Sequence, residues 1–516
     1  MNAAEPNPVM SPARRRLILL AMTGSLSMIM IDITMVGVAL PEIGRDLQLD
    51  GNALEWVVNA YLLVMASLIA LGGRVGDYFG KPRVFVVGMI IFALGSLWCG
   101  LSGSGISLIA GRVCQGFGAV LMQPASSAIV LSSAPPEARG RTMAVYVGIP
   151  LLFLTMGPLM GGLITEWFGW SWAFLVNIPI AVIALVITFK ARPQDTGSVR
   201  EPLDLPGTFF LVLGMPCFVI ALQQSGVWGP LDPRTIGLGI VGVIALVLFG
   251  RRQFVAEHPV LHFGLFRDKA FMANALLLML VQFSLAGVLI QLSLYAQIVL
   301  EYDPAEAGLA ILPLMIPVLL VVHFAGRSYD RMGVRIPAAI GVVGSVIGLA
   351  LMGWGAWVMS YPIIVVGMIF LGGTTSFATM PANTDGMARV PPMRRGQASG
   401  ILQTCRQVGG ALGIATYSAA GALTRPPGDS VVRDCGADPG VVDLAIAGDV
   451  DAIGKLEASG ATECVAMVHE AISRGTGSAL FVGALVTMGG LFIALRFAPS
   501  APFGKNESTS QPARTS

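Results

Sequence analysis

The sequence predicts an all-α polytopic membrane protein. Its 516 residues are 54% hydrophobic and only 12% charged, whereas about 25% of the residues of a soluble domain carry a charge. Apolar runs of about 18 or more residues recur along the chain, and each run is long enough to cross a bilayer as a helix. The runs are continuous rather than alternating, which is atypical of a transmembrane β-barrel. The net charge of +2 indicates no strong attraction to nucleic acid.

Fourteen of these runs are predicted to be membrane helices. They span residues 17–41, 53–73, 83–101, 106–131, 141–165, 171–190, 204–224, 234–250, 270–300, 306–326, 336–356, 361–382, 397–423 and 475–497. The expected divisions are a cytoplasmic segment 1–16, a six-helix bundle 17–190, two inserted helices with linkers 191–269, a second six-helix bundle 270–497 with an outer loop 424–474, and a disordered tail 498–516.

Lysine and arginine residues set the expected orientation. With the N-terminus inside, almost all of the basic residues in short loops fall on the inner side, and the short outer loops hold only Arg45 and Arg234. Such an asymmetry marks the cytoplasmic side of a membrane protein. The first apolar run is too long for a signal peptide. We therefore expect a multi-pass protein of the cell's inner (plasma) membrane with both termini in the cytoplasm.

Asp32 is the only charged residue of the first apolar run. A carboxylate at membrane depth costs roughly 2.5 to 3.5 kcal/mol, so its presence favours a functional role. Arg112 lies in another apolar run, with Gln115 one helical turn further on, and is the candidate partner. A carboxyl group can exchange its proton, whereas arginine stays charged. The alternative is that Asp32 only pairs with a basic residue to lock the helix packing.

The pattern G-R-x-x-D-x-x-G, followed by basic residues, occurs twice, after the second and the tenth predicted helix. Its equivalent positions indicate duplicated halves. Each aspartate can accept backbone N–H bonds at a helix start or pair with arginine, and each first glycine permits close helix approach. We expect these inner loops to hold the inner side shut in one state; the alternative is a topology determinant without a gating role. The candidate gating residues are Gly73, Arg74, Asp77, Gly80 and Arg83 of the first copy and Asp330 of the second.

These patterns resemble the motifs of the major facilitator superfamily, and in particular those of its fourteen-helix drug–proton antiporters. Besides the repeated loop motif, the similar stretches are 31–41, 112–118, 157–162, 172–179 and 406–410. The resemblance implies two six-helix bundles with two inserted helices. It also implies that Arg112 and Gln115 belong to the proton-coupling motif. The chain departs from the family pattern at Gly37, where Asn is usual, and at Phe153, where Gly is usual.

The fifth predicted helix has a face of small residues. Gly157, Pro158, Gly161 and Gly162 match the antiporter motif of the family that the sequence resembles. Proline removes a hydrogen bond of the helix and glycine permits tight approach. This face suits a helix that rocks against its neighbour in the other half, and static helix packing is the alternative.

Three further polar residues lie at membrane depth. Arg406 either serves the coupling cavity or locks onto a carbonyl group or Asp385. Gln291 and Gln297 either line the substrate cavity or hydrogen-bond between helices.

The six cysteines predict at most one disulfide. Cys435 and Cys464 share the outer polar loop, where a disulfide between them is expected; two free thiols are the alternative. No Cys/His spacing predicts a metal site.

The resemblance implies a proton-coupled multidrug efflux transporter that exports hydrophobic or cationic compounds by alternating access. Asp32 would hold either a proton or a cationic substrate, so that entry of one expels the other. No P-loop, nucleophile elbow or H-E-x-x-H motif occurs, so we expect neither an ATP-driven pump nor an enzyme, and no cofactor. The expected partners are a small-molecule substrate, protons and membrane lipid, with the protein as a monomer. The alternatives are an exporter of a lipid, amino acid or endogenous metabolite on the same fold, and a non-transporting membrane scaffold.

Overall fold

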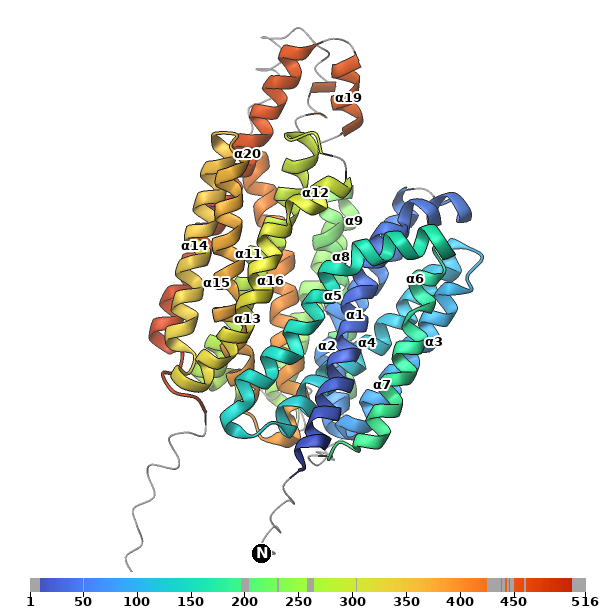
Figure 1. Cartoon of the computed structure of the whole chain (residues 1–516), viewed down its shortest axis with the longest axis vertical. Coiled ribbons are helices and arrows are strands. Elements are labelled where there is room, and N and C mark those ends of the chain that lie inside the picture. Colours follow the sequence, from blue (N-terminus) through green and yellow to red (C-terminus); the bar gives the residue numbers. More distant parts are fainter. Residues whose placement is uncertain are drawn as a thin grey trace, which may run out of the picture.

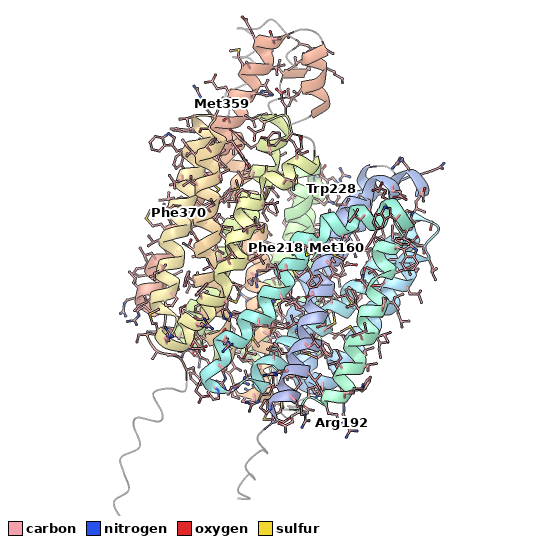
Figure 2. The ribbon with its side chains drawn as sticks, viewed as in Figure 1. Met160, Arg192, Phe218, Trp228, Met359 and Phe370 are labelled. Atoms are coloured by element: carbon pink, nitrogen blue, oxygen red, sulfur yellow. The ribbon has the colours of Figure 1, made fainter. Side chains whose placement is uncertain are left out.

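The computed structural model describes residues 10–49, 51–195, 204–229, 232–257, 264–302, 304–424, 438, 441–442, 445, 450–458 and 461–503, which are almost entirely helical. Two bundles of long helices stand side by side, and α8 and α9 lie behind them (Figure 1). Apolar side chains cover the outer surfaces, as at Met359 and Phe370, which are both more than two-fifths exposed (Figure 2). An apolar exterior suits a bilayer as solvent.

The N-terminal bundle contains six long helices. They are α1 (Pro12–Leu47), α2 (Gly51–Phe79), α3 (Lys81–Gly100), α4 (Gly105–Ser133), α5 (Arg139–Phe168) and α7 (Asn177–Ala191), with the short η1 (Pro136–Ala138) and α6 (Trp172–Leu175). Ser11 caps α1 and Ser104 caps α4, since each hydroxyl accepts a backbone N–H from the first turn. α1 packs along α5 and α7, whereas α4 packs along α2 and α3.

The C-terminal bundle has the same packing pattern. Its long helices are α11 (Lys269–Ile298), α13 (Leu312–Met332), α14 (Arg335–Trp357), α15 (Tyr361–Ala388), α16 (Arg395–Thr424) and α20 (Thr462–Phe497), with the short α10 (Gly264–Arg267), α12 (Pro304–Ala310), η2 (Pro392–Arg394) and α19 (Val450–Ala458). α11 packs along α16 as α1 packs along α5, and α15 packs between α13 and α14 as α4 packs between α2 and α3.

Two seams join the bundles, one between α2 and α16 and one between α5 and α13. The helices α8 (Leu205–Trp228) and α9 (Pro233–Val255) form a pair, and α8 contacts both α2 and α16. The inserted pair therefore lies against the first seam.

Within the described residues, eleven helices are long and apolar enough to cross a membrane. The helices α5, α8 and α16 are not among them, although α8 contributes the shorter apolar stretch Leu205–Ala221. The chain is thus a multi-pass helical membrane protein, and the predicted number of fourteen spans stays a prediction.

Several of the predicted helix ends are wrong. Both copies of the repeated motif were expected in loops, but α2 continues to Phe79 and α13 to Met332, so each aspartate lies in the last turns of a helix. The last helix was expected to begin at residue 475, but α20 begins at Thr462, so residues 462–474 of the expected outer loop are helical. The first turns of α20 form a helix because Cys464, Val468 and Ile472 bury themselves in an apolar cluster with residues of α11 and α19.

Candidate functional site

Asp32 lies inside the N-terminal bundle and its side chain is fully buried. One carboxylate oxygen, Oδ2, accepts a hydrogen bond of 2.6 Å from Arg112 Nη1 on α4. The other, Oδ1, accepts bonds of 2.7 Å from Gln115 Nε2 and 2.9 Å from Asn177 Nδ2 on α7. The carboxylate therefore joins α1 to two other helices and faces the protein interior rather than lipid.

Ser96 on α3 completes this polar cluster. Its hydroxyl accepts a 2.9 Å bond from Gln115 Nε2 and a longer one, of 3.4 Å, from Asn177 Nδ2. Because charge-assisted hydrogen bonds are stronger than neutral ones, the bonds to Asp32 dominate, and the serine fixes the orientation of the two amides.

Arg112 is fully buried and makes further hydrogen bonds and aromatic contacts. Its Nε donates to the carbonyl group of Val57 at 2.9 Å, and its Nη1 also donates to Gln115 Oε1 at 2.7 Å. The guanidinium carbon lies 4.4 Å from the centre of the Tyr61 ring and 5.7 Å from that of Phe174. These cation–π contacts stabilise the buried positive charge.

The cluster is neutral as a whole and still has unused polar atoms. Arg112 Nη2, Asn177 Oδ1 and Tyr61 Oη are buried without a hydrogen-bond partner. Protonation of Asp32 would remove the one negative charge that balances Arg112, and a buried charge without its partner is unfavourable by several kcal/mol. Protonation of Asp32 can therefore cause Arg112 and its neighbours to change their positions.

Sequence reasoning placed Asp32, Arg112 and Gln115 together, and the geometry brings them together. The sequence did not predict that Asn177 and Ser96 belong to the cluster. Asn177 stands in the stretch 172–179 that carries the family resemblance, so the signal was present. Ser96 carries no sequence signal, because a single serine in an apolar helix is common.

The second functional region is the end of the molecule where α1 begins, lowest in Figure 1. There Asp77, at the end of α2, caps the first turn of α16 in the other bundle. Its Oδ1 and Oδ2 accept backbone N–H bonds from Gly396 at 3.0 Å and Gln397 at 2.6 Å. Lys81 pairs with Asp77 at 2.8 Å and donates to the carbonyl group of Met393 at 2.9 Å. A carboxylate suits a helix start because it meets both the free N–H groups and the positive end of the helix dipole.

Asp330 makes the equivalent contact at the other seam. Its Oδ1 and Oδ2 accept backbone N–H bonds from Gly140 at 2.9 Å and Arg141 at 3.1 Å, at the start of α5. Each copy of the repeated motif thus caps a helix of the opposite bundle, and two reciprocal contacts join the bundles at this end.

The first glycine of each copy allows this contact. A Cβ atom at Gly73 would overlap the carbonyl oxygen of Gly396, and one at Gly326 would overlap that of Gly140. The helices therefore meet backbone to backbone at both seams, as close approach between membrane helices requires.

The last glycine of each copy ends its helix. Gly80 has a φ of 92° and Gly333 a φ of 69°, values that disfavour residues with a Cβ atom. Of the two arginines predicted here, Arg74 is fully buried, whereas Arg83 is exposed.

The small-residue face of α5 packs within its own bundle, and its role in gating stays a prediction. A Cβ atom at Gly157 would overlap Thr34 Oγ1, and one at Gly161 would lie 2.9 Å from the Cα atom of Met35. Both glycines therefore pack against α1 of the same bundle, and the nearest atom to Gly162 also belongs to α1. α5 meets the other bundle through residues nearer its start. Pro158 lies within α5, and the surroundings of its side chain are outside the described part of the structure.

The other predicted polar residues lie apart from Asp32. Arg406 on α16 has one weak bond, from Nη2 to Gln282 Oε1 at 3.4 Å. Gln291 accepts from Thr476 Oγ1 at 3.5 Å, between α11 and α20, and Gln297 donates to Ser293 of its own helix at 3.0 Å. Both glutamines thus hydrogen-bond within or between helices, and their place in a substrate cavity stays a prediction.

Asp385, which sequence reasoning considered as a lock for Arg406, has other partners. Its carboxylate accepts bonds from Asn274 at 2.8 Å, Tyr329 at 3.2 Å and Arg389 at 2.5 Å.

Cys464 is buried and disulfide-bonded. Cys435 lies outside the described residues, so its pairing with Cys464 stays a prediction. Four cysteines, Cys99, Cys114, Cys217 and Cys405, are free.

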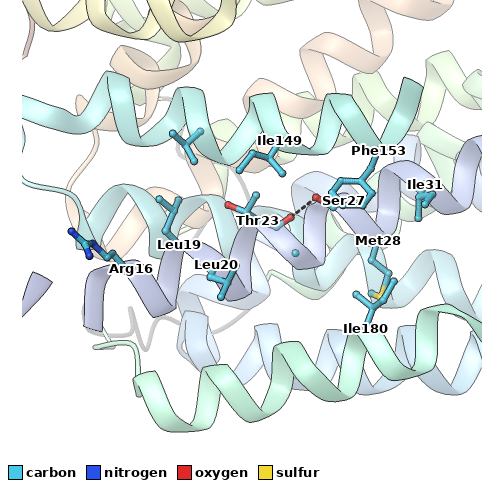
Figure 3. Close-up of a pocket in the computed structure, with 12 residues that line it drawn as sticks. Arg16, Leu19, Leu20, Thr23, Ser27, Met28, Ile31, Ile149, Phe153 and Ile180 are labelled. Carbon is cyan, nitrogen blue, oxygen red and sulfur yellow. Dashed lines mark hydrogen bonds between the residues drawn. The ribbon is translucent and has the colours of Figure 1, made fainter. Parts of the chain in front are cut away.

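A cavity of about 470 Å³ lies along α1 between α5 and α7 (Figure 3). Leu19, Met28, Ile149 and Phe153 line it, and Arg16 lies at one end. Ile31 reaches this cavity, but its neighbour Asp32 does not line it. The buried ion pair is therefore separated from this apolar space.

The chain matches the family model described as Major Facilitator Superfamily over residues 22–414. The multidrug resistance protein Stp of Mycobacterium tuberculosis (strain CDC 1551 / Oshkosh) is 31% identical over 405 residues, which cover 78% of this chain and 75% of Stp. The puromycin resistance protein pur8 of Streptomyces alboniger is 33% identical, with 75% and 78% covered. The tetracenomycin C resistance and export protein of Streptomyces glaucescens is 30% identical, with 92% and 90% covered.

Solved structures show the same fold at low sequence identity. The human organic anion transporter MFSD10 (TETRAN) has a TM-score of 0.60 at 14% identity, with 94% of this chain and 100% of that chain covered. The proton:xylose symporter XylE, bound to 6-bromo-6-deoxy-D-glucose, has a TM-score of 0.59 at 13% identity, with 97% and 99% covered. Together with the two-bundle architecture and the paired motifs, these matches show that the chain belongs to the major facilitator superfamily and is a membrane transporter rather than an enzyme.

Proposed function

We propose that this protein is a proton-coupled efflux transporter for hydrophobic or cationic compounds, and that Asp32 is the group whose protonation drives export. The observation that carries the proposal is the fully buried Asp32–Arg112 pair, 2.6 Å apart, within the membrane-spanning part of the N-terminal bundle. Ionisable groups in such a place are unfavourable unless they serve transport or packing.

The relatives support a drug-like cargo. Their names refer to multidrug resistance, to puromycin resistance and to export of tetracenomycin C. We therefore expect drug-like organic compounds as the cargo of this protein. An aspartate as the exchange group favours cations among them, since a cation and a proton would compete for the same carboxylate.

The coupling step follows from the charge balance of the cluster. While Asp32 is ionised, it accepts from Arg112, Gln115 and Asn177 and ties α1 to α4 and α7. Once Asp32 is protonated, the attraction to Arg112 is lost and these helices are free to shift. Proton binding at Asp32 thereby changes the relative stability of two arrangements of the N-terminal bundle, which is what coupling requires.

The contacts between the two bundles at the end where α1 begins act as the gate. The two caps made by Asp77 and Asp330 stabilise the arrangement closed at the end where α1 begins, which we assign to the cytoplasmic side from the distribution of basic residues. Breaking both caps would let the bundles rock apart there and admit cargo from the cell interior. Rocking of two bundles is the usual motion of transporters built from repeats.

We further propose fourteen membrane spans, with α5, α8 and α16 added to the eleven apolar helices. α5 and α16 line the two seams, so the helices that they meet, rather than lipid, cover much of their surface. Both termini would then lie in the cytoplasm and the protein would work as a monomer in the plasma membrane.

The experiment is dye efflux from proteoliposomes under an imposed pH gradient. Asp32→Asn should abolish gradient-driven transport, and Asp32→Glu should retain part of it because a titratable carboxyl remains. Asp46→Asn on the same helix, where Asp46 accepts from Trp170 Nε1 at 2.9 Å, is the matched control and should transport normally. Gradient-driven efflux at the wild-type rate in Asp32→Asn would refute the coupling role.

A further inference from the structure

A second cavity, of about 280 Å³, lies at the closed end of the molecule between the starts of α5 and α16. Its polar lining consists of Ser132, Ser133, Gln194, Arg139 and Arg395. Arg139 belongs to the N-terminal bundle and Arg395 to the C-terminal one, so the cavity spans both halves. It is distinct from the Asp32 cluster and from the apolar cavity on α1.

The two arginines occupy equivalent positions in the repeat. Arg139 precedes Gly140 and Arg395 precedes Gly396, the two glycines whose N–H groups the aspartates of the opposite bundle cap. Closure at this end therefore brings two positive charges into one cavity.

Neither arginine has an acidic partner among the described residues. Arg395 is only 4% exposed; its Nη1 donates to Ser132 Oγ across the seam at 2.8 Å, and its Nε is buried without a partner. Arg139 Nε is also buried without a partner. By contrast, the buried ends of Arg112 and Arg389 meet aspartates.

The nearest acids along the chain do not neutralise the cavity. Asp195 follows Gln194, but its carboxylate lies against Gly80. Glu137 precedes Arg139 by two residues and is exposed. Among the described residues the cavity therefore holds one buried and one half-buried cation without an acid, which is unfavourable unless an anion from outside enters it.

We propose that this cavity binds a phosphate-type oxyanion, which bridges Arg139 and Arg395 and fastens the two bundles together at the closed end. The planar guanidinium group matches the geometry of phosphate, with two parallel N–H donors to two oxygens. Ser132, Ser133 and Gln194 add neutral donors around the same space. The volume lies just below the range of about 300 to 1,000 Å³ usual for small-molecule sites, which suits a single phosphate group.

The anion can come from solution or from a phospholipid headgroup, because both present the same oxygens. In either case it stabilises the closed arrangement, since opening would separate its two ligands. Anion binding in this cavity requires neither Asp32 nor proton coupling.

The test is thermal unfolding of the purified protein in phosphate or sulfate against chloride at matched ionic strength. Phosphate and sulfate should raise the melting temperature of the wild type in a saturable manner. Arg139→Gln and Arg395→Gln should weaken the apparent affinity at least tenfold, and Arg139→Lys, which keeps the charge but loses the fork, should weaken it severalfold. Arg267→Gln, an exposed arginine outside the cavity, should leave it unchanged.

The same variants distinguish a destabilised fold from a lost site. Removing one of two like charges relieves repulsion, so without phosphate Arg139→Gln should melt no lower than the wild type. In detergent without phospholipid, stabilisation by free phosphate assigns the anion to solution. Stabilisation by phosphatidylglycerol alone, lost in both variants, assigns it to a lipid headgroup. Equal shifts in the wild type and in all variants, or no shift with either source, would overturn the proposal.

Discussion

Asp32 Oδ2 and Arg112 Nη1 lie 2.6 Å apart, and neither side chain has any exposed surface. A pair so thoroughly desolvated gains little net stability from its attraction, yet removal of one partner is strongly destabilising because the other charge stays buried alone. Neutralising Asp32 alone should therefore lower the stability of the fold strongly. Neutralising Arg112 as well should restore much of that stability.

A double-mutant cycle tests this relationship. Asp32→Asn and Arg112→Gln should each destabilise the protein by about 3 to 5 kcal/mol, because each leaves one buried charge unpaired. The double variant should lose clearly less than the sum of the two. The measurement is thermal unfolding in detergent, with Asp46→Asn as the control for a lost carboxylate on α1. Strict additivity would show that the two charges do not depend on each other.

The glycines at the seam give the second prediction. Gly73→Ala should force α2 and α16 apart, because its Cβ atom would overlap the carbonyl oxygen of Gly396. Gly76→Ala, one turn further along α2, meets nothing within 4 Å and is the matched control. A cysteine at Ser399, which is 3% exposed and bonded to Ser127 across the seam at 2.7 Å, serves as the reporter.

Gly73→Ala should raise the alkylation rate of this reporter several-fold and lower efflux, whereas Gly76→Ala should change neither. Wild-type alkylation in Gly73→Ala would mean that the seam can absorb a methyl group, and that close contact at this point is not needed for closure.

Loss of the two caps should have unequal effects. An aspartate cap stabilises a helix by about 0.5 to 2 kcal/mol. Asp77→Ala and Asp330→Ala should each destabilise the closed arrangement, relative to the open one, by at least that amount. Asp77→Ala should lose more, because Lys81 is 1% exposed and would keep a buried charge without its partner. The Ser399→Cys reporter should therefore react fastest in Asp77→Ala, next in Asp330→Ala and slowest in the wild type. The reverse order of the two variants would contradict the contribution of Lys81.

Much of the site could be predicted from the sequence because charges in apolar runs are rare. Asp32 and Arg112 stand out for that reason, and the repeat made Asp77 and Asp330 candidates for helix capping. The identity of the capped helices could not be predicted, because no local pattern says which helix start faces which aspartate. Only the packing of α2 on α16 and of α5 on α13 decides that.

The sequence also does not predict which helix packs against a face of glycines, for a similar reason. Gly157 and Gly161 mark a helix side that something approaches closely, but the neighbour is fixed by the arrangement of six helices. In α16 the equivalent glycines, Gly409 and Gly413, likewise back onto α11 of their own bundle, against the backbone of Met279 and Phe283. Both faces therefore hold each bundle together internally, and the seams use other glycines.

This assignment gives the last prediction, at the contact between α5 and α1. Gly157→Ala should destabilise the protein by about 1 to 3 kcal/mol through overpacking, because its Cβ atom would overlap Thr34 Oγ1. Gly162→Ala, whose nearest neighbour is Val38 Cγ1 at 3.9 Å, should be tolerated. Thr34→Ala removes the clashing oxygen and should restore part of the stability when it is combined with Gly157→Ala. The measurement is the melting temperature of the four variants beside alkylation of the Ser399→Cys reporter. Because the contact lies within one bundle, the melting temperature should fall while the reporter stays protected; faster alkylation in Gly157→Ala would instead place this face at the moving seam.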